Sequence, residues 1–183
     1  MEVQFKLLNE KLGTLFVGHK HHIIDVDKEI RKCVDHHNYL LKFVDHSNKT
    51  YSLTLLVYLG NVVFAMCVEF YTVSKQISSA VTSKALVYIS TILFQFFFFY
   101  CMPAQLLANE SELTPNVVFA NNWEDLSSPS VKCAIKLIIQ RCRKPVSVLA
   151  GGIFPINLES GLVTLKTITS YYMFLRTITE GVE

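Results

Sequence analysis

An uncharged stretch of 23 residues, Ala85 to Leu107, constrains the fold more than any other feature of the sequence. At about 1.5 Å of rise per residue, a helix of this length covers roughly 34 Å, enough to cross the hydrocarbon core of a bilayer. Pro103 lies near the end of the stretch, where a kink or a helix end is tolerated. The stretch therefore predicts a transmembrane helix.

A second apolar stretch runs from Leu53 to Val73 and carries one ionisable side chain, Glu69. Glu69 is either a functional carboxylate within the membrane or, more simply, an interfacial acid that reaches the headgroups. The linker between the stretches, residues 72–84, is short and polar, so we expect an antiparallel transmembrane hairpin over residues 51–107. Overall the chain is only 17% charged, against roughly 25% in typical soluble domains, which excludes an ordinary soluble protein.

Residues 1–50 have a different character, with eight Lys/Arg and seven Asp/Glu. Apolar residues recur there at helical spacing, which predicts two amphipathic helices. The first helix would present Phe5, Leu8, Leu12 and Leu15, and the second Val26, Ile30, Val34, His37, Leu41 and Val44. The N-terminus lacks the continuous apolar core of a signal peptide.

Beyond Leu107 the sequence turns polar, and an amphipathic basic helix over residues 131–144 is expected to stop at Pro145. Breaks follow at Gly151, Gly152 and Pro155. Asn157 suits the N-cap of a last helix, from Leu158 to about Thr177. That helix carries three charged residues and so needs protein or water on at least one side. The chain thus divides into residues 1–50, 51–107, 108–150 and 151–183.

The distribution of basic residues predicts the orientation in the membrane. Eight precede the first span, two lie in the hairpin loop, and five follow the second span. Residues 1–50 and 108–150 should therefore be cytoplasmic, and the hairpin loop and C-terminus extracellular. The two sequons, at Asn48 and Asn109, would then lie in the cytoplasm and stay unglycosylated.

Few residues suggest chemistry. Six histidines lie between positions 19 and 46, but no Cys or carboxylate accompanies them at a recognised metal-site spacing, so we interpret them as surface and interface residues. The five cysteines form no CxxC pair, which fits a reduced or lipid-embedded setting. Without a phosphate loop, nucleophile elbow or zinc motif, we expect no enzyme, cofactor or metal site, and no nucleic-acid partner.

The last helix carries a narrow stripe of residues at spacings of four and three: Ser160, Thr164, Thr167, Tyr171 and Phe174. Hydroxyls ending in aromatic residues suit one wall of a water-filled path that narrows at its outer end. Close packing of two helices favours the same small residues. If the stripe lines a pore, several copies must gather round an axis, so this interpretation also predicts an oligomer.

Two segments, VVFANNWEDL (117–126) and IQRCRKPVSVLAGGIFPINLESGLVTLKTITSYYMFLR (139–176), resemble the ending of the insect odorant receptors. The shared features include Trp123, the Arg143-Lys144-Pro145 triplet, Phe154 and Ser170-Tyr171. The segment His37 to Phe43 also fits. The resemblance implies an all-α transmembrane fold of seven helices, of which this chain holds the last three and the preceding cytoplasmic helices. A partial or truncated member is therefore expected.

The same resemblance implies a function. The family forms tetrameric odorant-gated cation channels with a shared co-receptor in the plasma membrane, joined through the cytoplasmic anchor segment. Aligned on Ser170-Tyr171, the family's hydrophobic gate falls on Phe174 and its outer polar pore position on Thr177, where glutamine is usual. Candidate contacts for a small volatile ligand are Tyr88, Thr91 and Ile92. The alternatives are a gustatory-type receptor subunit and a truncated scaffold that does not conduct.

Overall fold

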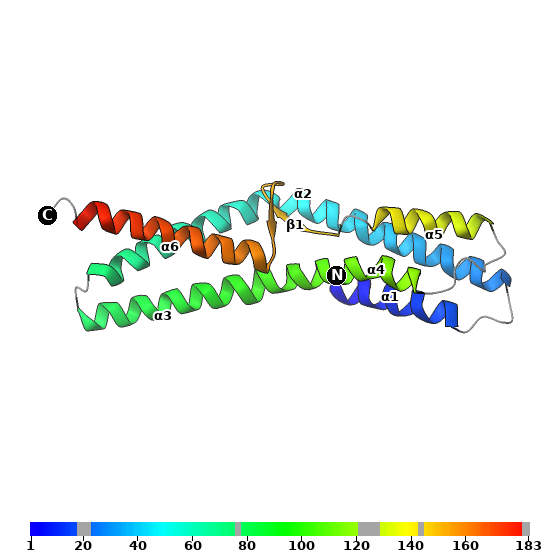
Figure 1. Ribbon diagram of the computed structural model, residues 1–183, viewed down its shortest axis with the longest axis horizontal. Helices are drawn as coiled ribbons and strands as arrows, with labels where there is room; N and C mark the ends of the chain where they lie inside the picture. The colour runs from blue at the N-terminus through cyan, green and yellow to red at the C-terminus, as the bar shows by residue number, and fades with distance from the viewer. Residues whose placement is uncertain (18–22, 76–77, 121–128, 143–144, 181–183) are drawn as a thin grey trace. The chain divides into compact units, whose positions relative to one another are not determined.

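A computed structural model describes residues 1–17, 23–75, 78–120, 129–142 and 145–180. It contains helices α1 (Glu2–Val17), α2 (Ile23–Lys75), α3 (Ser79–Gln95), α4 (Met102–Phe119), α5 (Pro129–Arg141) and α6 (Leu158–Glu180) (Figure 1). A π-helical segment, η1 (Phe96–Cys101), joins α3 to α4, and two short strands, β1 (Val148–Ala150) and β2 (Phe154–Ile156), precede α6. The predicted all-α class is confirmed, apart from the small hairpin of strands.

The chain forms two compact units, and α2 and α4 each contribute to both. Unit 1 comprises Met1–Ser47 and Leu106–Ser147, and unit 2 comprises Asn48–Gln105 and Val148–Glu183. Each unit is therefore built from segments that are far apart in the sequence.

The core of unit 1 is made by one apolar face of each of its helices. Phe5, Leu8 and Leu12 of α1 are buried, as their spacing predicted; Leu15 lies where side chains are not described. On α2 the buried residues include Ile30, His37 and Leu40, so the inward face passes through Leu40 rather than the predicted Leu41, which is half-buried. An apolar stripe on each helix is thus enough to close this unit.

The core of unit 2 gathers Val62, Met66, Ile89, Phe96, Cys101, Ala104, Ala150, Ile156 and Ile168. The rings of Tyr58 on α2 and Tyr100 on η1 are stacked with their centroids 4.2 Å apart. This contact fits the expected antiparallel hairpin of α2 and α3. That hairpin is tighter than predicted, because α2 continues to Lys75 and α3 begins at Ser79.

The helix that contains the second predicted span extends beyond that span. Rather than ending near Leu107, the chain stays helical through Pro103 and Pro115 as far as Phe119. A proline inside a helix removes one N–H and crowds the preceding turn. The wider turn of η1 lies directly before Pro103, and there the Met102 N–H donates to the Phe97 carbonyl oxygen, five residues back. A π-turn at this point leaves room for the proline ring.

Beyond Leu107, α4 presents a face of small and apolar residues to unit 1. Its buried members are Leu107, Ser111, Thr114 and Val118, at spacings of four, three and four. The sequence hides this face because two of its four residues are polar. The Ser111 hydroxyl accepts a hydrogen bond from the Val146 N–H at 2.9 Å and donates one to Ala108 O at 2.8 Å. Burial of the hydroxyl is therefore compensated.

Two helical stretches of the described residues, Lys28–Lys75 and Ser79–Phe119, are long and apolar enough to cross a membrane by length and composition. The predicted spans, 53–73 and 85–107, lie within them.

The strands β1 and β2 pair antiparallel through a turn at Gly151 and Gly152. Both glycines have positive φ, 63° and 72°, which side chains strongly disfavour. The turn lies against α2, since the Gly151 N–H donates to Ser52 O at 2.9 Å and a Cβ on Gly151 would lie 3.0 Å from Leu56. The sequence indicated only a break in regular structure at these glycines. In the structure, the turn is held against α2 a few residues before α6 begins.

Candidate functional site

Helix α6 begins at a reciprocal cap. The Ser160 N–H donates to Asn157 Oδ1 at 2.6 Å, and the Asn157 N–H donates to Ser160 Oγ at 3.0 Å. Asn157 is thus confirmed as the N-cap. The Ser160 hydroxyl also donates to Asn157 O at 3.0 Å. The hydroxyl of this first stripe residue therefore forms part of the helix cap.

The remaining residues of the stripe pass from buried to exposed along α6. Thr164 is only 8% exposed, whereas Thr167 is exposed, Tyr171 is 51% exposed and Phe174 is 60% exposed. Thr177 is exposed as well. The stripe residues are on average 3.5 positions apart, whereas an α-helix has 3.6 residues per turn. Successive stripe residues therefore shift gradually around the helix axis. Its beginning packs within unit 2, and its end is open to whatever surrounds this chain.

The threonine hydroxyls on α6 bond to their own helix. Thr164 donates to Ser160 O at 2.8 Å, Thr167 to Val163 O at 3.0 Å, and Thr177 to Met173 O at 2.9 Å. Each hydroxyl oxygen still has lone pairs that can accept a hydrogen bond. Where the threonines are exposed, they can therefore offer acceptors to water or ions without disturbing the helix.

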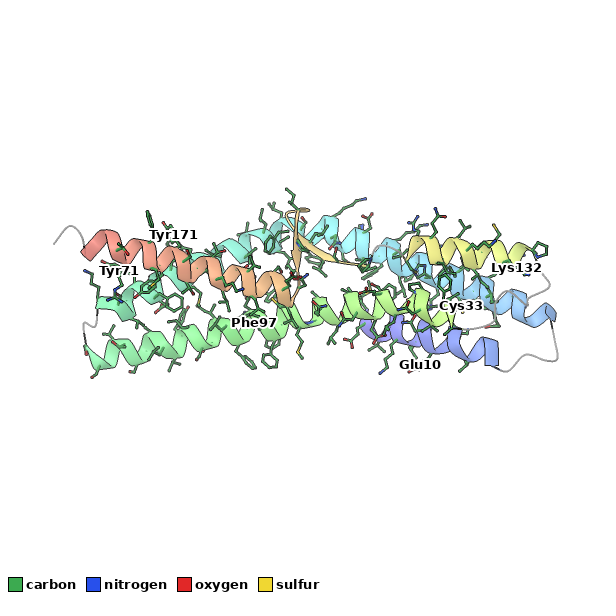
Figure 2. The ribbon with its side chains drawn as sticks, viewed as in Figure 1. Glu10, Cys33, Tyr71, Phe97, Lys132 and Tyr171 are labelled. Carbon is green, nitrogen blue, oxygen red and sulfur yellow. The ribbon has the colours of Figure 1, made fainter. Side chains whose placement is uncertain are left out.

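A groove of about 900 Å³ lies between α2 and α6 in unit 2. It is lined by Leu56, Leu59, Gly60, Val63, Phe64, Cys67, Val68, Tyr71, Thr167, Ile168 and Tyr171. Tyr71 and Tyr171 lie toward the same end of this unit, where α2 and α6 finish (Figure 2). Two residues of the predicted stripe, Thr167 and Tyr171, are thus brought into one apolar groove.

The predicted ligand contacts lie on α3 and do not share one environment. Tyr88 is 58% exposed, and Thr91 is exposed with its hydroxyl bonded to Val87 O at 2.9 Å. Ile92 instead packs against the buried cluster of unit 2. The groove between α2 and α6 includes none of the three.

Unit 1 contains a buried pair that sequence reasoning missed. The Cys142 Sγ lies 3.3 Å from His37 Nε2, and the Phe5 ring meets the His37 ring edge-on at 6.3 Å between centroids. Burial, followed by the nearby Arg141 and His36, lowers the pKa of His37, and burial raises the pKa of the Cys142 thiol to about 11. Both shifts favour the neutral forms of the two side chains. His37 was interpreted as a surface or interface residue; its place on the apolar face with Ile30 was the signal for the core.

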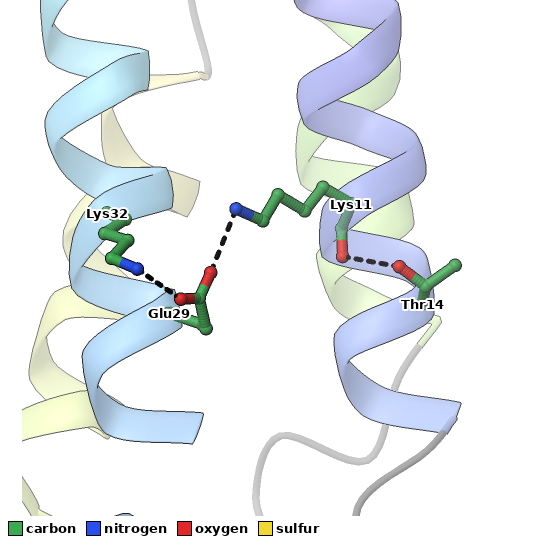
Figure 3. A network of polar contacts seen from close by, with 4 residues as sticks. All are labelled: Lys11, Thr14, Glu29 and Lys32. Carbon is green, nitrogen blue, oxygen red and sulfur yellow. Dashed lines mark hydrogen bonds and ion pairs between the residues drawn. The ribbon is translucent and has the colours of Figure 1, made fainter. Parts of the chain in front are cut away.

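Charged residues of unit 1 form an exposed network around Glu29 (Figure 3). Lys11 Nζ lies 2.9 Å from Glu29 Oε2, and Lys32 contacts the other carboxylate oxygen. Hydrogen bonds from Lys32 and then Lys11 lower the pKa of Glu29 to about 2. The network links α1 to α2 at their exposed surface, where ion pairs contribute little.

Across the described ranges, no three His, Cys, Asp or Glu side chains come together as a metal site. His19, His21 and His22 of the predicted histidine group lie outside the described residues.

Over the residues that the structure describes, the fold is that of an all-α protein with two helical stretches of membrane length and a further, capped helix, α6, that carries charge. The model of the 7tm odorant receptor family matches residues 1–169, and the chain belongs to this family of membrane proteins. The chain is 26% identical to odorant receptor 59b of Drosophila melanogaster over 174 residues, which is 93% of this chain and 42% of that receptor. It is 22% identical to the odorant receptor coreceptor of Ooceraea biroi over 82% of this chain and 31% of the coreceptor.

Among solved structures, the fold matches that of the insect olfactory receptor OR5 from Machilis hrabei in complex with eugenol. The TM-score is 0.83 at 17% identity, over 97% of this chain and 44% of that receptor. The chain therefore spans less than half the length of the relatives that it matches.

Proposed function

We propose that this chain is the C-terminal portion of an odorant receptor subunit, which forms an odorant-gated cation channel with a co-receptor. The observation that carries the proposal is the exposed end of the stripe on α6, where Phe174 and Thr177 lie outside the groove and are open to partners outside this chain. Aromatic residues and hydroxyls on one helix suit a pore that narrows at a hydrophobic constriction. Four such helices around an axis would complete the pore.

The partners and the ligand follow from the relatives. The likeness to a co-receptor supports a partner of that kind. The assembly that we propose with it is a hetero-tetramer. OR5 was solved with eugenol, a small organic molecule, which supports the same class of ligand for this receptor. The outer half of α3, with Tyr88, Thr91 and Ile92, is the proposed contact region in this chain.

Gating would be a population shift. Odorant binding would favour a state in which Phe174 of each subunit moves away from the axis, so that the constriction becomes wet. In this arrangement residues 1–50 and the anchor at 108–150 are cytoplasmic, and the C-terminus is extracellular in the plasma membrane.

Patch-clamp recording of the receptor that carries this sequence, co-expressed with the co-receptor, tests the role of Phe174. We expect Phe174→Ala to raise the leak current or shift the odorant response, because a smaller side chain leaves the constriction wider. Met173→Ala is the matched control, since Met173 is 55% exposed on the same helix but off the stripe. Equal behaviour of the two variants would count against Phe174 as the gate.

Recordings with Thr177→Gln test the outer pore position. Restoring the usual residue should change the relative permeability to monovalent and divalent cations, while Thr169→Gln, an exposed threonine that also bonds to its own helix, should not. If no odorant or tastant evokes current but the protein reaches the surface with its co-receptor, the scaffold alternative applies. Current evoked only by tastants would favour the gustatory alternative.

A further inference from the structure

We propose that the groove between α2 and α6 is a lipid site. It would hold one acyl chain of a membrane phospholipid, with the phosphate beside Lys75 and the chain reaching Gly60. The site is separate from the ligand contacts proposed on α3. It assigns Thr167 and Tyr171 of the stripe to the groove and leaves Phe174 and Thr177 for the pore, so it does not depend on whether the channel conducts. It requires only that the second half of α2 lies in the bilayer, as membership of this membrane protein family implies.

The walls of the groove are chemically suited to hydrocarbon. No charged side chain lines it, and the Thr167 hydroxyl already donates to Val163 O at 3.0 Å. The two tyrosines, Tyr71 and Tyr171, lie at the end where α2 and α6 finish (Figure 2). At about 900 Å³ the groove is within the usual range for ligand sites, roughly 300–1,000 Å³. A water molecule in such a space would find few hydrogen-bond partners, whereas an alkyl chain has no hydrogen bonds to lose.

Gly60 provides the second, independent observation. A Cβ added to Gly60 would meet nothing within 4 Å, so no neighbour in this structure requires a glycine there. A glycine in a helix interior is less favourable than alanine. The space above Gly60 is therefore room for an occupant that the chain itself does not supply.

The neighbours of Gly60 identify a narrow occupant rather than another helix. Close helix packing in membranes uses small residues one turn apart, so that two backbones approach along a row. One turn before and after Gly60 stand Leu56 and Phe64, both bulky groove residues. The result is a single notch between large side chains, which admits a flexible chain but keeps a helix backbone away.

The length of the groove matches one leaflet. From Tyr71 to Gly60, α2 rises about 16 Å at about 1.5 Å per residue. Half of the hydrocarbon core is about 15 Å thick. The rings of Phe70 and Tyr172 lie 5.5 Å apart, so the two helices remain in contact at the tyrosine end. An acyl chain that enters beside Tyr71 and Tyr171 would thus end at the notch near the bilayer midplane.

Lys75 supplies charge complementarity at the mouth of the groove. Its Nζ lies 5.8 Å from the centre of the Tyr71 ring, one turn beyond the groove. Tyrosine and lysine both anchor helices at the membrane interface, and an ammonium group there can pair with lipid phosphate. A phospholipid satisfies both ends of the site, because its phosphate meets Lys75 and its tail fills the space above Gly60.

Photolabelling tests the acyl-chain part. The protein would be placed in phosphatidylcholine nanodiscs doped with a phosphatidylcholine that carries a mid-chain diazirine, and the labelled peptides mapped. We expect labels on α2 between Leu56 and Val68 and on α6 at Thr167 to Tyr171, and their loss in Gly60→Leu. The control is Val57→Leu, at a residue that is 65% exposed and outside the groove, which should keep the labels.

Gly60→Leu should fold, because its new side chain enters open space; an unchanged circular dichroism spectrum and elution volume would verify this. Gly60→Ala, which fills less of the notch, should give intermediate labelling. Groove labelling that survives in a folded Gly60→Leu protein would overturn the proposal, since it would come from the general lipid annulus. Absence of groove labels in the folded wild type would also overturn it.

A second probe isolates the headgroup. Lys75→Gln should lower labelling by the phosphatidylcholine probe but leave unchanged the labelling by a diacylglycerol with the same diazirine chain, because only the former carries phosphate. Equal effects on both probes, including none, would contradict the assignment of Lys75.

Discussion

The two halves of α2 both bury mainly apolar side chains, but the side chains that they expose differ in chemistry. In unit 1 the helix buries Ile30, His37 and Leu40 and exposes charged residues such as Lys32. In unit 2 it buries Val62 and Met66, yet Leu53 and Phe64 are both 70% exposed. Because one continuous helix carries both surfaces, the difference reflects what surrounds each unit. Water suits the first half, and lipid suits the second.

The difference also changes what holds each unit together. In water, burial of apolar surface drives packing at about 25 cal/mol per Å². Between lipid-embedded helices that drive is absent, and packing depends on van der Waals contact and interhelical hydrogen bonds. Substitutions matched between the two units can therefore test the comparison directly.

The largest effect should come from the core of unit 1. Phe5 is fully buried, so Phe5→Ala should cost about 3–5 kcal/mol of local stability. Hydrogen exchange of the α1 and α5 peptides would measure it in the intact protein. Val3→Ala, on the same helix but 64% exposed, should change exchange little. Similar exchange in the two variants would mean that α1 is not packed as an amphipathic helix on a water-facing unit.

A lysine placed on the outward face should separate the two halves of α2. Phe64 is 70% exposed in unit 2 and Tyr39 is 64% exposed in unit 1, so the pair is matched in size and exposure. Lysine near the middle of a span costs about 3 kcal/mol on insertion, so Phe64→Lys should lower the inserted fraction in a microsomal assay. Tyr39→Lys should leave it unchanged. Equal insertion of both variants would contradict the inference that the second half of α2 faces lipid.

How far the sequence predicts this structure follows the same division. Hydrophobic spacing located the buried faces of α1 and α2, and the two long apolar stretches located both membrane-length helices. It did not show that α4 continues to Phe119, because Ser111 and Thr114 look like solvent residues until their packing partners are known. Nor did it show how η1 relieves Pro103, since a π-turn depends on the geometry of the whole helix.

The candidate sites were predicted less completely. The stripe on α6 and its drift could be derived from spacing, but the burial of Thr164 and the exposure of Phe174 depend on which neighbours cover the helix. The groove was not foreseen, because Gly60 and Tyr171 are more than 100 residues apart in the sequence. The His37–Cys142 pair joins residues 105 positions apart, for the same reason.

Acidification should weaken unit 1 through His37. Its pKa is lowered in the folded state from 6.5, so the neutral form stabilises the fold and the contribution is complete above pH 6.5. As the pH falls below 6.5 the unfolded chain takes up the proton first, and stability is lost. Exchange of the α1 and α5 peptides should therefore rise between pH 7 and pH 5, after correction for intrinsic rates. His37→Gln should flatten this rise, while His46→Gln, at an exposed residue, should keep it.

The smallest expected effect is that of Glu29, and its pH window is separate. Its pKa is lowered from 4.5 to about 2 by Lys32 and Lys11, so its contribution is present above pH 4.5 and is lost as the pH falls toward 2. Because the carboxylate is at the surface, salt should screen the contribution, whereas the buried His37 step should resist salt. Glu29→Gln should therefore remove a salt-sensitive step below pH 4.5 and leave the step below pH 6.5 intact. Glu10→Gln, at an exposed glutamate of α1, should change neither step. If Glu29→Gln altered the upper step instead, the buried pair and the surface network would be coupled, and unit 1 could not be divided into a core that senses protons and a surface that senses salt.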